Sequence, residues 1–141
     1  MNRLIVAIPP GGLPEGFTDA VMARAKRSGA QLMALYVIDE VWSRYSGADW
    51  LSTGHSRSEF DGYMKATLRA EGERLINTLS GAAEREGVAF SSEILEGPPG
   101  EAVTNAARSI DTDEVVTAPD FPELETVKKK SHCPVILYPW T

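Results

Sequence analysis

The sequence is poor in the residues that hold disulfides and metals. Among 141 residues there is one cysteine, Cys133, so no disulfide can form within the chain. The two histidines, His55 and His132, do not stand at a metal-ligand spacing from Cys133 or from clustered carboxylates. We therefore expect no metal site and a reducing compartment, which makes the cytoplasm the predicted location.

The sequence also lacks an excess of basic charge and any long apolar run. Fourteen Lys and Arg against twenty Asp and Glu give a net charge of −6, which disfavours nucleic acid and anionic membrane surfaces as partners. The apolar run Leu4–Ile8 is too short for a secretory signal and stops at Pro9 and Pro10. We expect no nucleic-acid partner and no membrane association.

Catalytic motifs are absent as well. No G-x-S-x-G elbow accompanies the serines, and no glycine-rich loop follows the fourth apolar run. Cys133, at the start of an apolar run, is interpreted as a small core residue in preference to a redox sensor. Lys128–Lys130 is interpreted as the solvated end of a helix in preference to an anion site. The sequence therefore predicts a protein without enzymatic activity and without a cofactor.

What the sequence does contain is an alternation of short apolar runs with helix-length segments. The predicted strands are Leu4–Ile8, Gln31–Ile38, Val88–Leu95, Val115–Thr117 and Val135–Tyr138. The predicted helices are Pro14–Ser28, Ser58–Glu86, Glu101–Ser109 and Pro122–Ser131. This order predicts an α/β fold: one doubly wound domain over residues 1–141, with a five-stranded parallel sheet and four helices on both faces.

The first, second and fourth strands should form the buried centre of that sheet, because their apolar runs are continuous. The residues expected in the core are Ile5, Val6, Ala7, Leu35, Val37, Val115 and Val116. The third run alternates apolar and polar residues, which is typical of an edge strand.

One irregular segment, Asp39–Arg57, interrupts the pattern and carries Trp42, Tyr45 and Trp50. A loop this long in a compact domain is usually functional or partly disordered. Its aromatic residues either form a satellite core or cover the surface of a ligand or partner, and the sequence does not decide between these. We expect the segment to be mobile or to depend on a partner.

Four pieces of this sequence, in order, resemble the universal stress protein family. They are LIVAI at Leu4–Ile8 with the helix end RSGA at Arg27–Ala30, LYVID at Leu35–Asp39, EGPPGEAV at Glu96–Val103, and SHCPVIL at Ser131–Leu137. The resemblance covers nearly the whole chain. It implies a sheet of order 3-2-1-4-5 and a homodimer. In one branch of the family it also implies ATP bound at the carboxyl ends of strands one and four.

The chain departs from that branch at its nucleotide-binding positions. The branch ends strand one with D-G-S, where this sequence has Pro9, Pro10 and Gly11. It follows strand four with G-x-x-G and opens the last helix with Gly-Ser or Gly-Thr, and neither has a counterpart in Thr117–Pro122. Pro119 lacks an N–H group, and Asp120 would place a negative charge beside phosphate. The departures predict a divergent member that does not bind ATP.

The resemblance locates two candidate surfaces. If the family's crevice holds any ligand, the residues around it are Pro9, Pro10, Gly11, Val37, Asp39, Ala118, Pro119 and Asp120. The dimer interface expected at the last strand consists of Val135, Ile136, Leu137, Tyr138 and Trp140.

These observations favour a non-catalytic, stress-associated binding or regulatory module that forms a homodimer. One alternative is a nucleotide-binding family member with weak ATPase activity in an atypical pocket. Another is a structural domain that binds a protein partner through residues 39–57.

Overall fold

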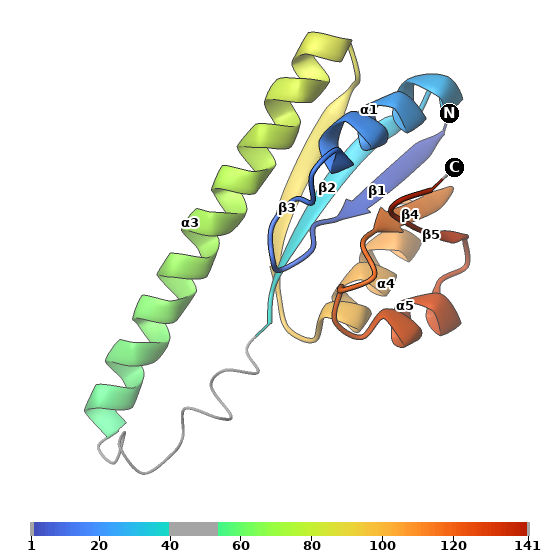
Figure 1. The fold of residues 1–141 in the computed structure, drawn as a ribbon. Coiled ribbons are helices and arrows are strands. Elements are labelled where there is room, and N and C mark those ends of the chain that lie inside the picture. The colour runs from blue at the N-terminus through green and yellow to red at the C-terminus, as the bar shows by residue number, and fades with distance from the viewer. Residues whose placement is uncertain (1, 40–53, 141) are drawn as a thin grey trace.

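The fold is a parallel sheet with helices on both faces, seen in a computed structural model that describes residues 2–39 and 54–140 (Figure 1). The strands are β1 (Arg3–Ala7), β2 (Gln31–Ile38), β3 (Phe90–Glu96), β4 (Glu114–Thr117) and β5 (Val135–Leu137). The helices are α1 (Phe17–Ser28), α3 (Gly54–Glu86), α4 (Pro99–Ser109) and α5 (Leu124–Lys130). The strand order is β3-β2-β1-β4-β5 and every pairing is parallel, which confirms the predicted fold class and topology.

The sheet separates two hydrophobic clusters because successive residues of a strand point to opposite faces. On one face, Leu4 and Val6 of β1, and Ile8 just after it, pack with α1 and α3. On the other, Ile5 and Ala7 pack with α4 and α5. Figure 1 shows the same two layers, and none of the described helices is long and apolar enough to cross a membrane.

The predicted centre of the sheet is confirmed, since β2, β1 and β4 are the three inner strands. Six of the seven expected core residues are buried, and Ile5, Val6, Val115 and Val116 have no exposed surface. The prediction was wrong for Val37, which is half-buried. Val37 lies on the α4 and α5 face of the sheet, at the margin of that hydrophobic cluster, whereas Ile38, on the opposite face, is buried.

Helix α3 is longer than predicted. It begins at Gly54, so residues 54–57, predicted as part of the irregular segment, are helical. With 33 residues and about 1.5 Å of rise per residue it is much longer than the eight-residue β2, and Figure 1 shows it extending past the strands. The predicted roles of Trp42, Tyr45 and Trp50 fall outside the described residues.

Helix α1 is shorter than predicted, because it begins at Phe17 and not at Pro14. Gly16 precedes it with φ 78°, a left-handed conformation that favours glycine. The Tyr138 hydroxyl donates to the Glu15 carbonyl at 2.7 Å, and a Cβ on Gly16 would lie 2.7 Å from that hydroxyl oxygen. A contact from the far end of the chain therefore helps to set where α1 starts.

Candidate functional site

Two loops meet where the chain leaves β1 and β4 in opposite directions, and we call residues 9–11 and 118–120 the switch point. Pro9 and Ala118 are buried, while Gly11 and Asp120 are exposed. A Cβ built on Gly11 would lie 3.5 Å from Asp120 Oδ2, so the carboxylate lies against the loop that follows β1. The structure thus brings together the two loops that the sequence named separately. In sheets of this kind the switch point is where ligands bind.

The end of β2 completes this edge of the sheet. Val37 and Asp39 are both half-buried at the carboxyl end of β2, which pairs with β1. On the other side, the Thr117 hydroxyl donates to the Ala7 carbonyl at 2.7 Å and ties the end of β4 to the end of β1. Pro9 and Ala118, the buried residues of the two loops, are both apolar.

Glu123 is a residue of this region that the sequence reasoning missed. It precedes α5 with φ 59°, a left-handed conformation that costs a non-glycine residue about 1–2 kcal/mol. Its Oε1 accepts a hydrogen bond from the Gly100 backbone N–H at 2.8 Å, in the first turn of α4. A Cβ on Gly100 would lie 2.9 Å from Thr126 Cβ and 3.0 Å from Glu123 Cβ, so the starts of α4 and α5 are in close contact. The one signal in the sequence was a glycine after two prolines at a helix start, which permits such an approach.

Two carboxylates lie in this region. Glu123 places one at the N-terminal end of α4, and Asp120 places the other beside Gly11. A helix N-terminus attracts anions, and at α4 the chain supplies a carboxylate of its own. Lys128–Lys130 form the last turn of α5, at the end away from the switch point, as the sequence predicted.

The comparison with family models decides what kind of chain this is. The model of the universal stress protein family matches residues 1–118. The chain belongs to the universal stress protein family. The match runs through β4 and ends at Ala118, so Pro119, Asp120 and Glu123 lie outside it. No curated protein sequence matches the chain at a significant level.

Solved structures of universal stress proteins share this fold. One from Burkholderia pseudomallei has a TM-score of 0.72 at 22% identity, covering 97% of this chain and 96% of its own. One from Arabidopsis thaliana with AMP bound has a TM-score of 0.65 at 14% identity, covering 97% and 90%. One from Archaeoglobus fulgidus in complex with dAMP has a TM-score of 0.63 at 13% identity, covering 97% of both chains. At these identities the likeness establishes the fold.

The remaining candidate side chains of this universal stress protein lie away from the switch point. Cys133 is half-buried against the α4–α5 cluster, and burial, together with the charges of Glu114 and Asp113, raises the pKa of its thiol. His132 Nε2 lies 3.1 Å from the Thr112 carbonyl oxygen. Within residues 2–39 and 54–140, no three His, Cys, Asp or Glu side chains are grouped so as to hold a metal ion.

The last strand lies at the edge of the sheet, as expected, but its flanking aromatic residues turn inward. Val135, Ile136 and Leu137 are half-buried beside β4. The Tyr138 and Trp140 rings pack edge-on against Phe17 of α1, with centroids 5.4 and 6.1 Å away. Part of the side-chain surface of Tyr138 and of Trp140 is therefore covered by Phe17 of the same chain.

Proposed function

We propose that this universal stress protein is a non-catalytic binding or regulatory module of the stress response, cytoplasmic and homodimeric, whose switch point does not hold ATP. The observation that carries the proposal is the pair of carboxylates there, with Glu123 bonded to the Gly100 N–H and Asp120 against Gly11.

The exclusion of ATP rests on missing hydrogen-bond partners for the nucleotide and on added negative charge. Pro119 offers no N–H group, and the Gly100 N–H already has a carboxylate partner. Pro9 stands where the ATP-binding branch has an aspartate, which is a third missing contact. A charge-assisted hydrogen bond is worth roughly 1.5–3 kcal/mol, so three missing contacts weaken binding by about three orders of magnitude or more. Repulsion from Asp120 and Glu123 acts in the same direction. A smaller neutral or apolar ligand against Pro9, Gly11, Val37 and Ala118 fits this edge better.

The small molecules released from freshly purified protein test the proposal. Mass spectrometry should find no adenine nucleotide in stoichiometric amount. Glu123→Gln should gain affinity for AMP by removing a charge next to α4, while the control Glu125→Gln should not. Glu125, in the first turn of α5, lies 3.8 Å from Lys128, so its substitution changes the net charge equally and leaves the Glu123–Gly100 hydrogen bond in place. Equal AMP affinity in both variants would contradict the role given to Glu123.

The second candidate function is nucleotide binding with weak ATPase activity. It is favoured by the relatives solved with AMP and with dAMP. Adenine nucleotide that remains with the protein through purification would replace the first proposal with this one.

A third candidate is a structural domain that binds a protein through residues 39–57. Deleting residues 40–53 should then abolish capture of a partner in a pull-down while leaving the thermal melting of the domain intact. Retained capture would remove this candidate.

The homodimer is proposed to form through β5. An edge strand presents backbone N–H and C=O groups that a second copy can pair with. Light scattering should give a dimer for the wild type and a folded monomer for Ile136→Lys. Ser92→Lys on β3, the opposite edge, should remain dimeric, with thermal melts reporting folding in all three. A monomeric wild type at micromolar concentration would contradict the proposal.

A further inference from the structure

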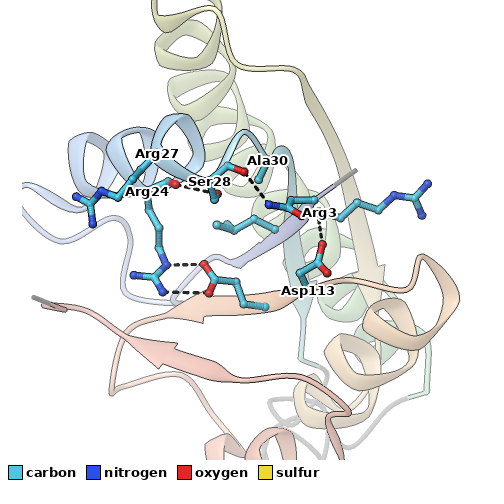
Figure 2. A pocket seen from close by; sticks show the side chains of 9 residues that line it. Arg3, Arg24, Arg27, Ser28, Ala30 and Asp113 are labelled. Atoms are coloured by element: carbon cyan, nitrogen blue, oxygen red, sulfur yellow. Dashed lines mark hydrogen bonds and ion pairs between the residues drawn. The ribbon is translucent and has the colours of Figure 1, made fainter.

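Several charged side chains at the amino ends of the strands are paired within the chain (Figure 2). Arg24 donates to both oxygens of Glu114, and Asp113 accepts the Arg3 backbone N–H at 2.7 Å. The pocket of about 360 Å³ that these residues help to line is therefore a junction between α1, β1 and β4. Backbone groups that a partner could bind lie elsewhere, on the outer side of β3.

β3 is an edge strand with one side of its backbone open. In the described parts of the chain it pairs only with β2. The Ala89 carbonyl accepts a hydrogen bond from β2 at 2.8 Å, and the Gly97 N–H donates one to β2 at 3.1 Å. Because successive residues of a strand direct their backbone groups to opposite sides, the odd-numbered residues between these two face β2. The residues whose N–H and C=O groups point outward are therefore Phe90, Ser92 and Ile94.

The middle of β3 is also open on both faces of the sheet. Ser91, Ser92 and Glu93 are all exposed, although their side chains alternate between the two faces. The pairing with β2 is continuous over all seven residues, and the strand contains no proline or lysine. Bulges, prolines and lysines are common means of protecting a free edge. β3 is thus a regular, accessible edge to which a further strand can be added.

The charge beside this edge selects the strand that can be added. Glu93 is exposed and has no hydrogen bond or ion pair within the described residues. Glu96, in contrast, is held by Lys65 and Arg69 of α3, at 3.3 and 3.6 Å. A second copy of β3 would bring its own Glu93 to the pairing, and like charges across paired strands are destabilising. A strand with a cationic side chain next to Glu93 would be attracted.

A groove of about 330 Å³ lies between β3 and α4, beside Glu93. Its apolar residues, Leu95, Ala102 and Ala106, are half-buried, so each presents some surface. Its polar residues are Glu93, Glu96, Asn105 and Ser109. On an added strand, a residue two positions from the cation points to the same face, so an apolar side chain there can pack in the groove.

We propose that the outer edge of β3 binds an extended segment of a protein partner, which pairs with β3 as a sixth strand. The segment carries a lysine or arginine next to Glu93 and an apolar residue two positions away. The outward backbone groups of β3 form the hydrogen bonds, while Glu93 and the groove select the side chains. This inference rests on the binding role proposed above. It does not involve the switch point, so titrations with peptide and with nucleotide can fail independently.

The peptide acetyl-TVTKTVT-amide is the probe. Its Val, Lys and Val side chains share one face, and its sequence reads the same in both directions, so it can pair parallel or antiparallel. In ¹⁵N–¹H NMR titrations it should shift the amides of Ser92 and Ile94 saturably. Hydrogen exchange of these two amides should slow, because their N–H groups gain partners, while the Ser91 and Glu93 amides, already bonded to β2, should change less.

Two results would overturn the proposal. One is the lack of any saturable shift up to about 10 mM peptide, a weak-binding limit. The other is protection of the Ser92 and Ile94 amides in the free protein that is lost on dilution, because a second copy of the chain would then occupy the edge.

A charge-reversed peptide tests the role of Glu93. Acetyl-TVTETVT-amide should bind the wild type about fivefold more weakly, because an attractive cross-strand pair becomes a repulsive one. Glu93→Gln should bind both peptides about equally. Glu125→Gln, which removes the same charge from α5, should keep the wild-type preference. Equal binding of the two peptides by the wild type, or an unchanged preference in Glu93→Gln, would overturn the selection of a cationic segment.

A proline tests the pairing of the backbone. Ser92→Pro removes the outward N–H at the centre of β3 and leaves the hydrogen bonds to β2 in place, so thermal melting should show a folded protein. It should lose peptide binding, whereas Ser92→Ala, which keeps the N–H, should bind as the wild type does. Equal peptide affinity in the two variants would overturn the proposal.

Discussion

Replacing Gly72 by alanine should destabilise the protein, although glycine inside a helix is ordinarily unfavourable. In the structure, a Cβ at this position would lie 2.4, 2.8 and 2.9 Å from Cδ2, Cγ and Cε2 of Tyr36. Carbon atoms prefer about 3.5–4.0 Å, and Tyr36 is 4% exposed, so its ring has no open space to move into.

The size of the effect follows from two opposing contributions. Overpacking a core costs typically about 1–3 kcal/mol, and a contact this short belongs at the upper end. Alanine gains about 1 kcal/mol over glycine in a helix. The expected net loss of unfolding free energy in Gly72→Ala is about 2 kcal/mol. For a chain of this size that corresponds to a melting temperature lower by roughly 6–10 °C.

Gly81→Ala in the same helix is the matched control. Its Cβ would meet only the end of the Arg85 side chain, at 3.5 Å, so this variant should gain about 0.5–1 kcal/mol. Urea unfolding followed by circular dichroism measures both variants. A double-mutant cycle with Tyr36→Ala should show a coupling of about 3 kcal/mol between positions 36 and 72, because without the Tyr36 ring Gly72→Ala keeps only its gain of about 1 kcal/mol in helix propensity. Gly72→Ala as stable as Gly81→Ala, or a coupling near zero, would refute the reasoning.

Three further predictions concern buried groups. Val6→Asp should leave the chain unfolded, because an unpaired buried charge costs several kcal/mol, which is comparable to the whole stability of such a domain. A soluble variant with an unchanged melting temperature would show that β1 is misplaced. Burial raises the pKa of Tyr36, with Glu71 adding to it, so its contribution to stability is complete below about pH 10 and is lost as the pH rises further. Tyr36→Phe should lack that part of the alkaline loss, and identical urea midpoints against pH in both proteins would contradict this. The raised pKa of Cys133 should make its thiol react with iodoacetamide more slowly at neutral pH in the folded than in the urea-unfolded protein; equal rates would contradict this.

The centre of the fold could be predicted because it depends on local composition. Continuous apolar runs such as Leu4–Ile8 occur where helices cover both faces of a strand, and β1 is buried on both faces. The start of α1 could not be predicted, because the Tyr138 hydroxyl that binds Glu15 comes from 123 residues along the chain. The start of α3 was predicted at Ser58, four residues after Gly54, where the helix begins.

At the switch point, the sequence identified the loops but not their most informative contact. Pro9 and Asp120 could be grouped from the sequence because parallel strands bring their carboxyl ends to one edge of the sheet. The bond between Glu123 and Gly100 depends on the adjacency of α4 and α5, and no periodicity encodes it. The side chains that line the pocket in Figure 2 come from three distant segments, so the sequence gave no reason to group them.

Isothermal titration of the wild-type protein with Mg-ATP tests the central claim most directly. The carboxylates of Asp120 and Glu123, with the missing N–H of Pro119, predict no saturable binding tighter than about 100 μM. Saturable binding tighter than that limit, at one nucleotide per chain, would contradict the claim and show that the switch point holds ATP through other contacts.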